Sequence, residues 1–122
     1  MTAQALHIRL ELAREPGHPA GDPRTGYDIV AFLDDEGRLD LEACRDQADR
    51  CRVRRFEDDA TVATGLLRHT TGDRWILDFP EDREDATGFR LSDERFVPGE
   101  YVSMTAGDGV AHTYFVERVG EV

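Results

Sequence analysis

Short segments in which apolar and polar residues alternate constrain the fold of this chain more than any other feature. In residues 6–12 the apolar positions occur at every second residue: Leu6, Ile8, Leu10 and Leu12. A period of two places these side chains on one face of an extended strand and their neighbours on the other. The segment is therefore predicted to be a half-buried β-strand.

Further segments with the composition of strands follow along the chain. They lie at 27–33, 52–56 and 61–69, then at 74–79 with a short one at 88–91, and finally at 96–106 and 110–119. Turn residues such as those at 34–37, 70–73 and 107–109 separate them. The total of about seven strands with short connections favours antiparallel pairing.

Residues 40–51 form the one predicted helix. Asp40 is a suitable N-cap, and one face of the helix is apolar, with Leu41, Cys44, Ala48 and Cys51. In a continuous helix the seven-residue spacing would separate the two cysteine Cα atoms by ~10 Å. A disulfide requires a Cα separation of less than about 7 Å, so free buried thiols in a reducing cytoplasm are predicted.

One short helix cannot cover the apolar face of so many strands. The sheet must therefore close or fold on itself to bury that face. We predict a mainly β (α+β) protein: a small antiparallel β-barrel or strongly curved sheet of about seven strands, with the helix near residues 40–51 across one end. With 122 residues, the chain is expected to form a single β-barrel-like domain over 1–122 with a dry, side-chain-filled interior.

Residues 15–26 contain three prolines and three glycines, which predicts a long loop. Long loops in compact domains are often functional. We therefore expect this loop, which contains His18, to be one contact surface of the protein.

The net charge of −11 limits the partners of this protein. It opposes binding to phosphate backbones and to anionic membrane surfaces. No apolar run approaches the ~20 residues of a membrane-spanning helix, and the first residues do not have the pattern of a signal peptide. A cytoplasmic protein is expected.

Four arginines form the one basic cluster of this acidic chain: Arg50, Arg52, Arg54 and Arg55. In a strand, Arg52 and Arg54 would face one side and Arg55 the other. They either pair with nearby acidic residues, such as those at 57–59, or form a recognition patch for a phosphate, a carboxylate or an acidic protein segment.

Three histidines, His7, His69 and His112, fall on three separate predicted strands. Their convergence in the barrel would create a metal site or an enzyme active site, but none of them has a closely spaced partner in the sequence. His7 is expected to point away from the core. No metal and no cofactor are predicted.

Trp75 is the single tryptophan of the chain. It is predicted to lie in the core beside Leu77 and Phe79, which share its face of the strand. A half-exposed position at the barrel mouth would instead make it a binding anchor.

Several short motifs resemble those of an uncharacterised family of small acidic bacterial proteins of unknown function. They are Leu6-His7-Ile8-Arg9-Leu10, Gly37-Arg38-Leu39-Asp40, Gly99-Glu100-Tyr101-Val102-Ser103-Met104, Asp108-Gly109 and His112-Thr113-Tyr114. The resemblance implies a bacterial, cytosolic, single-domain protein and implies no activity.

The chain lacks a nucleophile elbow and a glycine-rich phosphate loop, so no catalytic residue is assigned. We therefore expect a non-enzymatic β-barrel module that binds a protein partner or a small ligand, as a monomer or weak homodimer. Two alternatives remain open. One is a metal-binding protein or enzyme that uses the strand histidines, and the other is a nucleic-acid binder that uses the arginines at 50–55.

Overall fold

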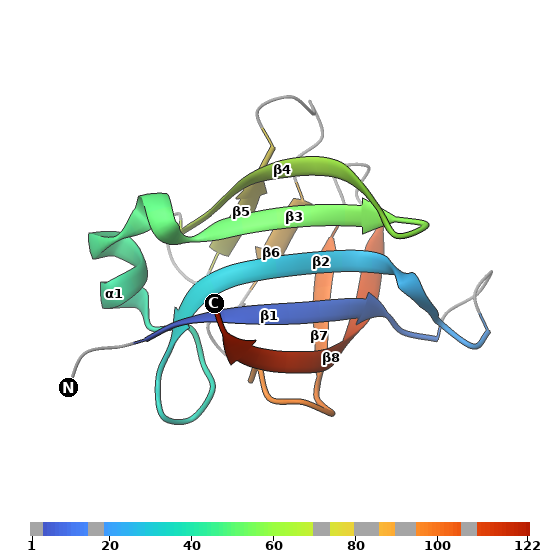
Figure 1. Cartoon of the computed structure of the whole chain (residues 1–122), viewed down its shortest axis with the longest axis horizontal. Helices are drawn as coiled ribbons and strands as arrows, with labels where there is room; N and C mark the ends of the chain where they lie inside the picture. The colour runs from blue at the N-terminus through green and yellow to red at the C-terminus, as the bar shows by residue number, and fades with distance from the viewer. Residues whose placement is uncertain (1–3, 15–18, 70–73, 80–85, 90–94, 106–109) are drawn as a thin grey trace.

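Eight antiparallel strands form a barrel in a computed structural model of the chain (Figure 1). The structure describes residues 4–14, 19–69, 74–79, 86–89, 95–105 and 110–122. The first four strands are β1 (Gln4–Leu12), β2 (Asp22–Leu33), β3 (Arg52–Glu57) and β4 (Ala60–His69). The other four are β5 (Arg74–Asp78), β6 (Ala86–Phe89), β7 (Tyr101–Thr105) and β8 (Ala111–Glu121).

Each strand pairs with the next one in the sequence, and β8 returns to pair with β1. The closing ladder runs from Leu6 opposite Glu121 to Leu12 opposite Tyr114. The ladder between β6 and β7 is the shortest, with one described pair of residues, Thr87 and Thr105. The prediction of a small antiparallel barrel or strongly curved sheet is confirmed in its barrel form, with eight strands instead of about seven. Closure leaves β1 without a free edge.

Apolar side chains that alternate along the strands fill the barrel interior. Trp75, Leu77 and Leu10 are completely buried, and Phe79 is almost completely so. The same core also contains residues from β2, β3, β7 and β8: Ile29, Val53, Val102, Met104 and Val116. The predicted core position of Trp75 is confirmed, so this side chain is not an exposed anchor at the barrel mouth.

The helix is shorter than predicted. Helix α1 (Leu41–Asp46) begins after the N-cap Asp40, whose carboxylate accepts a hydrogen bond from the Ala43 amide at 3.0 Å. It ends because Gln47 leaves the helical region, with φ −126° and ψ 49°, and the 3-10 turn η1 (Ala48–Arg50) follows. The Leu67 amide of β4 donates to the Cys51 carbonyl at 2.9 Å, which holds Cys51 beside the sheet. A helix continuous to Cys51 is therefore wrong.

The predicted loop at 15–26 is also too long. Residues 15–18, including His18, lie outside the described residues, and β2 begins at Asp22. Gly26 is extended because it pairs with Glu11 on one side and with Phe56 on the other. Strand pairing with two neighbours therefore overrides the turn-forming composition of this segment.

Two other strand boundaries differ from the sequence prediction. The strand predicted at 88–91 lies at 86–89. The strand predicted from residue 96 begins at Tyr101, because a turn precedes it in which the Glu100 amide donates to the Val97 carbonyl at 3.0 Å. Gly99 in this turn has a φ of 96°, a conformation that glycine adopts readily.

Within the described part of the chain, no helix has both the length and the apolar character needed to cross a membrane.

Candidate functional site

The outer face of β1–β4 carries a row of polar side chains that crosses all four strands. Arg9 pairs with Asp28, Asp28 with Arg54, and Arg54 with Thr64. Residues that are opposite each other in antiparallel strands project to the same face. Arg9, Asp28, Arg54 and Thr64 therefore lie side by side on the outer face.

A second row lies two residues further along each of these strands. His7 pairs with Val30, Val30 with Arg52, and Arg52 with Leu66. Because side chains repeat every two residues, this row shares the outer face with the first. Two sequence predictions are confirmed: His7 faces away from the core, and Arg52 and Arg54 share one face of their strand.

Asp28 is the centre of an ion-pair network on this face. Its Oδ1 lies 2.9 Å from the His7 Nε2, and its Oδ2 accepts a hydrogen bond from the Arg54 Nε at 3.0 Å. The Arg54 Nη2 also donates to Oδ2, and the Arg9 Nη1 lies 3.8 Å from it. The Asp28 side chain is only 12% exposed, so this carboxylate depends on its cationic partners for compensation.

An aromatic ring lies beneath the two arginines of this network. The guanidinium carbons of Arg9 and Arg54 are 4.3 Å and 5.3 Å from the centroid of the Phe56 ring, which is buried. Arg54 also donates to the Thr61 hydroxyl at 2.8 Å. Cation–π contact and hydrogen bonding therefore fix the orientation of both guanidinium groups.

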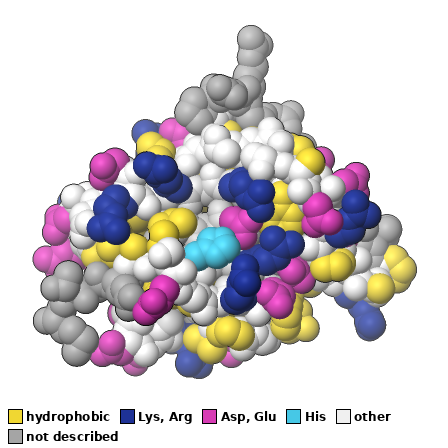
Figure 2. Space-filling view, viewed as in Figure 1, with side chains coloured by type: hydrophobic (Ala, Val, Ile, Leu, Met, Phe, Trp, Pro, Cys, Tyr) yellow, Lys and Arg dark blue, Asp and Glu magenta, His cyan; other side chains and the backbone are white. Residues whose placement is uncertain are grey.

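A groove of about 810 Å³ opens beside the Asp28 network. Figure 2 views this face and shows basic side chains (dark blue) around a histidine (cyan), next to a hydrophobic strip (yellow). The groove is lined by the apolar residues Val30, Val53 and Leu66, by Gly65, and by the polar residues His7, Asp28, Asp49, Arg52, Arg54 and Thr64. The site thus offers hydrogen-bond donors beside an apolar wall.

The arginine cluster predicted at 50–55 is divided by the structure. Arg50 lies in η1, 5.5 Å from the centroid of the Phe32 ring, and donates to the Gln47 side chain at 2.8 Å. Arg55 lies opposite Tyr27 on the inner face of the sheet. Of the four arginines, Arg52 and Arg54 line the groove, and Arg55 lies on the opposite face of the strand, as its alternation predicts.

Arg55 belongs to a polar cluster at the inner face of the barrel. Its guanidinium carbon is 6.0 Å from the centroid of the Phe79 ring, and it hydrogen-bonds with the Tyr27 phenol. The rings of Tyr27 and Tyr114 meet edge to face at 5.2 Å, with a hydrogen bond between their side chains. Burial raises the pKa of the Tyr27 phenol above its ordinary value, and the hydrogen bonds oppose this effect.

The structure does not bring the three strand histidines together. His7 lies in the groove, the His69 ring is 5.0 Å from the Trp75 ring, and His112 is opposite Met104. Among the residues that the structure describes, no three His, Cys, Asp or Glu side chains form a group that could hold a metal ion.

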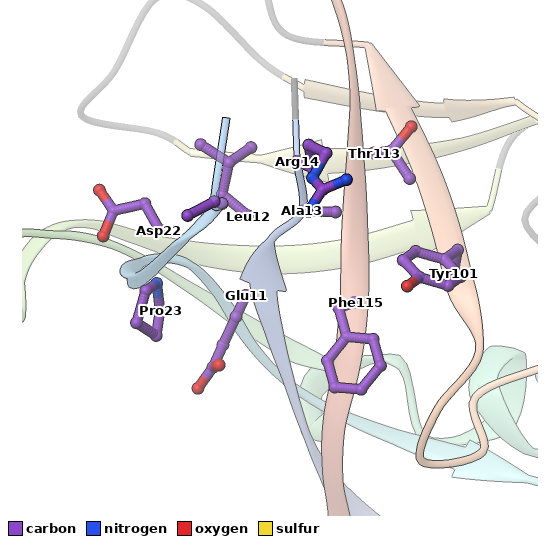
Figure 3. A pocket seen from close by; sticks show the side chains of 11 residues that line it. Glu11, Leu12, Ala13, Arg14, Asp22, Pro23, Tyr101, Thr113 and Phe115 are labelled. Carbon is purple, nitrogen blue, oxygen red and sulfur yellow. The ribbon is translucent and has the colours of Figure 1, made fainter. Parts of the chain in front are cut away.

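A second pocket of about 660 Å³ lies where β1 and β2 meet β7 and β8 (Figure 3). The aromatic rings of Tyr101 and Phe115 meet at 5.6 Å on one side of it, and Glu11 and Pro23 lie on the other. Ala20, Gly21, Asp22 and Pro23 line it, so part of the predicted contact loop borders a pocket.

Sequence reasoning missed two residues of the site, Asp28 and Phe56. A charged residue between Tyr27 and Ile29 in the middle of an apolar strand was the available signal for Asp28. Phe56 had no such signal, because its position beneath Arg9 depends on the pairing of β1, β2 and β3.

The chain matches no known family model, no curated protein and no solved structure. The resemblance to small acidic bacterial proteins therefore brings no functional residue to this site, and the groove is interpreted from its own chemistry.

Proposed function

We propose that this protein is a non-enzymatic binding module whose ligand site is the groove on β1–β4. The ligand carries a carboxylate on an apolar body. One observation carries this proposal: the guanidinium group of Arg52 borders the groove next to Leu66 and forms no ion pair with a described carboxylate.

The groove offers hydrogen-bond donors that no described carboxylate occupies, and the Asp49 carboxylate also lines it. The Arg52 Nε donates only a long hydrogen bond, of 3.4 Å, to the Asp49 carbonyl. The Thr64 hydroxyl, which also lines the groove, has no hydrogen-bond partner among the described side chains. The acceptor Asp28 is already occupied by His7 and Arg54. A guanidinium group binds both oxygens of a carboxylate, so an acid is the ligand that matches these donors.

The apolar wall of the groove indicates the rest of the ligand. Leu66 is 36% exposed on the outer face of the barrel, and Val30 is half-buried beside Arg52. Burial of this surface against an aliphatic or aromatic group contributes about 25 cal/mol per Å². The groove volume of about 810 Å³ lies in the size range of small-molecule sites.

The contacts of Asp28 favour a binding surface. Its carboxylate contacts His7, Arg54 and Arg9 together, so the three side chains are held in one ion-pair network. The network therefore supports a fixed recognition surface.

The acid belongs either to a small molecule or to an acidic segment of a protein partner. An NMR titration of the protein with three probes distinguishes these two sources. The probes are hexanoate, its amide, and a blocked peptide with one glutamate between two leucines. Hexanoate is expected to shift the amide resonances of Val30, Arg52 and Leu66, and its amide is not. If only the peptide shifts them, the ligand is a protein segment.

Arg52→Gln is expected to weaken binding of the active probe by about tenfold, which corresponds to about 1.4 kcal/mol. Arg24→Gln is the matched control, because Arg24 is an exposed β2 arginine that pairs with Asp59 away from the groove lining. Equal weakening by the two substitutions, or no shift with any probe, would rule out the groove as a carboxylate site.

The proposal includes a bacterial, cytoplasmic location and a monomeric or weakly dimeric state. Free thiols at Cys44 and Cys51 and the net charge of −11 support it. Fractionation of the source cells and sedimentation at several concentrations test the location and the oligomeric state.

A further inference from the structure

The early end of α1 brings two cysteines into contact. Cys44 lies in α1, and the turn η1 returns the chain so that Cys51 lies directly before β3. The Cys51 Sγ lies 3.9 Å from the Cys44 carbonyl oxygen, and both thiols are free. The continuous helix expected to separate their Cα atoms by ~10 Å is absent, and the predicted free, buried thiols are confirmed.

Backbone hydrogen bonds hold both cysteines in place. The Cys44 amide donates to the Asp40 carbonyl at 2.9 Å, and the Cys51 amide donates to the Ala48 carbonyl at 3.2 Å. The Cys51 carbonyl accepts from Leu67 of β4 at 2.9 Å. The dithiol is thus fixed between the helix and the sheet.

The two thiols differ in their chemical character. Interaction with the neighbouring Cys51 thiol lowers the pKa of the Cys44 thiol, because it favours the thiolate, although burial acts in the opposite direction. The neighbouring Cys44 thiol and burial raise the pKa of Cys51. Cys44 is therefore the thiol that loses its proton first.

Cys44 also has access to solvent through a small pocket. It is 5% exposed and lines a pocket of about 330 Å³, whereas Cys51 is completely buried. Arg45, Arg68 and His69 line the same pocket. Of these, Arg68 pairs with Asp78, and the charged group that acts on the Cys44 thiol is Asp40, which raises its pKa.

We propose that Cys44 and Cys51 form a hydroperoxide-reactive dithiol, in which Cys44 reacts first and Cys51 resolves it as an intramolecular disulfide. This site is independent of the ligand groove on β1–β4.

The chemistry balances with a hydroperoxide as the oxidant. The Cys44 thiolate attacks the peroxide, so that an S–O bond forms and the O–O bond breaks. One peroxide oxygen remains on Cys44 as a sulfenic acid. The other leaves as hydroxide and takes up the proton that Cys44 released, which forms the first water. The Cys51 sulfur then attacks the sulfenic sulfur; an S–S bond forms and hydroxide leaves with the Cys51 proton as the second water. Two thiols lose two electrons and two protons to the peroxide.

Peptide mapping of the full chain tests this reaction directly. The reduced protein is treated with hydrogen peroxide, alkylated and digested with trypsin, which cleaves after Arg38, Arg45, Arg50 and Arg52. Cys44 and Cys51 then lie in separate fragments, 39–45 and 51–52. The expected product is a disulfide that joins these two fragments of one chain. A disulfide between two chains, or retention of both thiols, would overturn the proposal.

Two variants test the order of the steps. Cys51→Ser is expected to stop at a sulfenic acid on Cys44, which dimedone traps. In Cys44→Ser, Cys51 is expected to react with peroxide about tenfold more slowly than Cys44 reacts in Cys51→Ser. The reason is that Cys51 is completely buried and its pKa is raised. Equal rates in the two variants would overturn the order.

A measurement on the wild-type chain keeps the proposal testable if a variant does not fold. Thiol loss is followed in the native protein and in concentrated guanidinium chloride. Faster loss in the native protein is expected, because the fold places Cys51 beside Cys44. Slower loss in the native protein would show that the fold protects the thiols, and would overturn the proposal.

Discussion

Gly26 lies opposite Phe56 in the β2–β3 ladder, and its other side pairs with Glu11 of β1. A Cβ atom at Gly26 would fall 1.9 Å from the carbonyl oxygen of Leu10 in β1. The absence of a side chain at Gly26 therefore allows β1 to pack against β2 at this point. This packing also brings Arg9 of β1 over the Phe56 ring of β3.

Gly26→Ala is expected to lower the free energy of unfolding by about 2–3 kcal/mol, because the added methyl group forces β1 and β2 apart. Gly120→Ala is the control, since Gly120 also lies in a strand but has no atom within 4 Å of its Cβ position. It should change stability by less than about 0.5 kcal/mol. Urea unfolding measures both, and a similar loss in both variants would show that the close approach of β1 does not constrain residue 26.

Asp28→Asn is expected to destabilise the protein by about 1–2 kcal/mol, because Arg54 and Arg9 lose their shared carboxylate in a mostly buried place. The control is Asp59→Asn, which breaks the ion pair of Arg24 with a carboxylate that is 59% exposed. An exposed pair contributes little, so this change should stay below about 0.5 kcal/mol. Thermal unfolding measures the difference between the two variants, and its absence would contradict a central role of Asp28.

The raised pKa of Tyr27 predicts a loss of stability in alkaline solution. The folded state favours the neutral phenol, mainly because burial disfavours the phenolate. The neutral Tyr27 phenol contributes to the free energy of unfolding. Its contribution is fully present below the ordinary pKa of 10.0 and is lost as the pH rises through the raised pKa of the folded state. Tyr27→Phe should reduce the fall in urea stability above pH ~10. An unchanged pH profile in this variant would assign the alkaline unfolding to other groups.

Trp75 should report the closed, filled barrel by its fluorescence. It is completely buried, so the native protein should emit at short wavelength and should be little quenched by acrylamide. Unfolding in urea should move the emission to longer wavelength and increase quenching. Strong quenching under native conditions would indicate that solvent reaches the barrel interior.

The alternation of residues 6–12 was sufficient to predict β1, since a period of two leaves a strand one apolar face. The same logic placed Trp75 and Leu77 in the core and Arg52 and Arg54 on the opposite face from Val53. These properties are local, because neighbouring residues of a strand determine which side chains share a face.

The end of α1 and the start of β2 were not predictable in this way. The composition of 40–51 favours a longer helix, but α1 ends at Asp46, and Cys51 instead accepts a hydrogen bond from Leu67 of β4. The proline- and glycine-rich composition of residues 15–26 favours a loop, but Gly26 pairs with Glu11 and Phe56 and is a strand residue. In both cases hydrogen bonds to distant residues outweigh local propensity.

The sequence by itself determined that this chain forms an antiparallel barrel and which side chains of each strand point inward. Only the tertiary structure decided that His7, Asp28 and Arg54 form one network and that Cys44 meets Cys51. The physical reason is that strand alternation depends on adjacent residues, whereas register and chain reversal depend on contacts between residues far apart in the sequence.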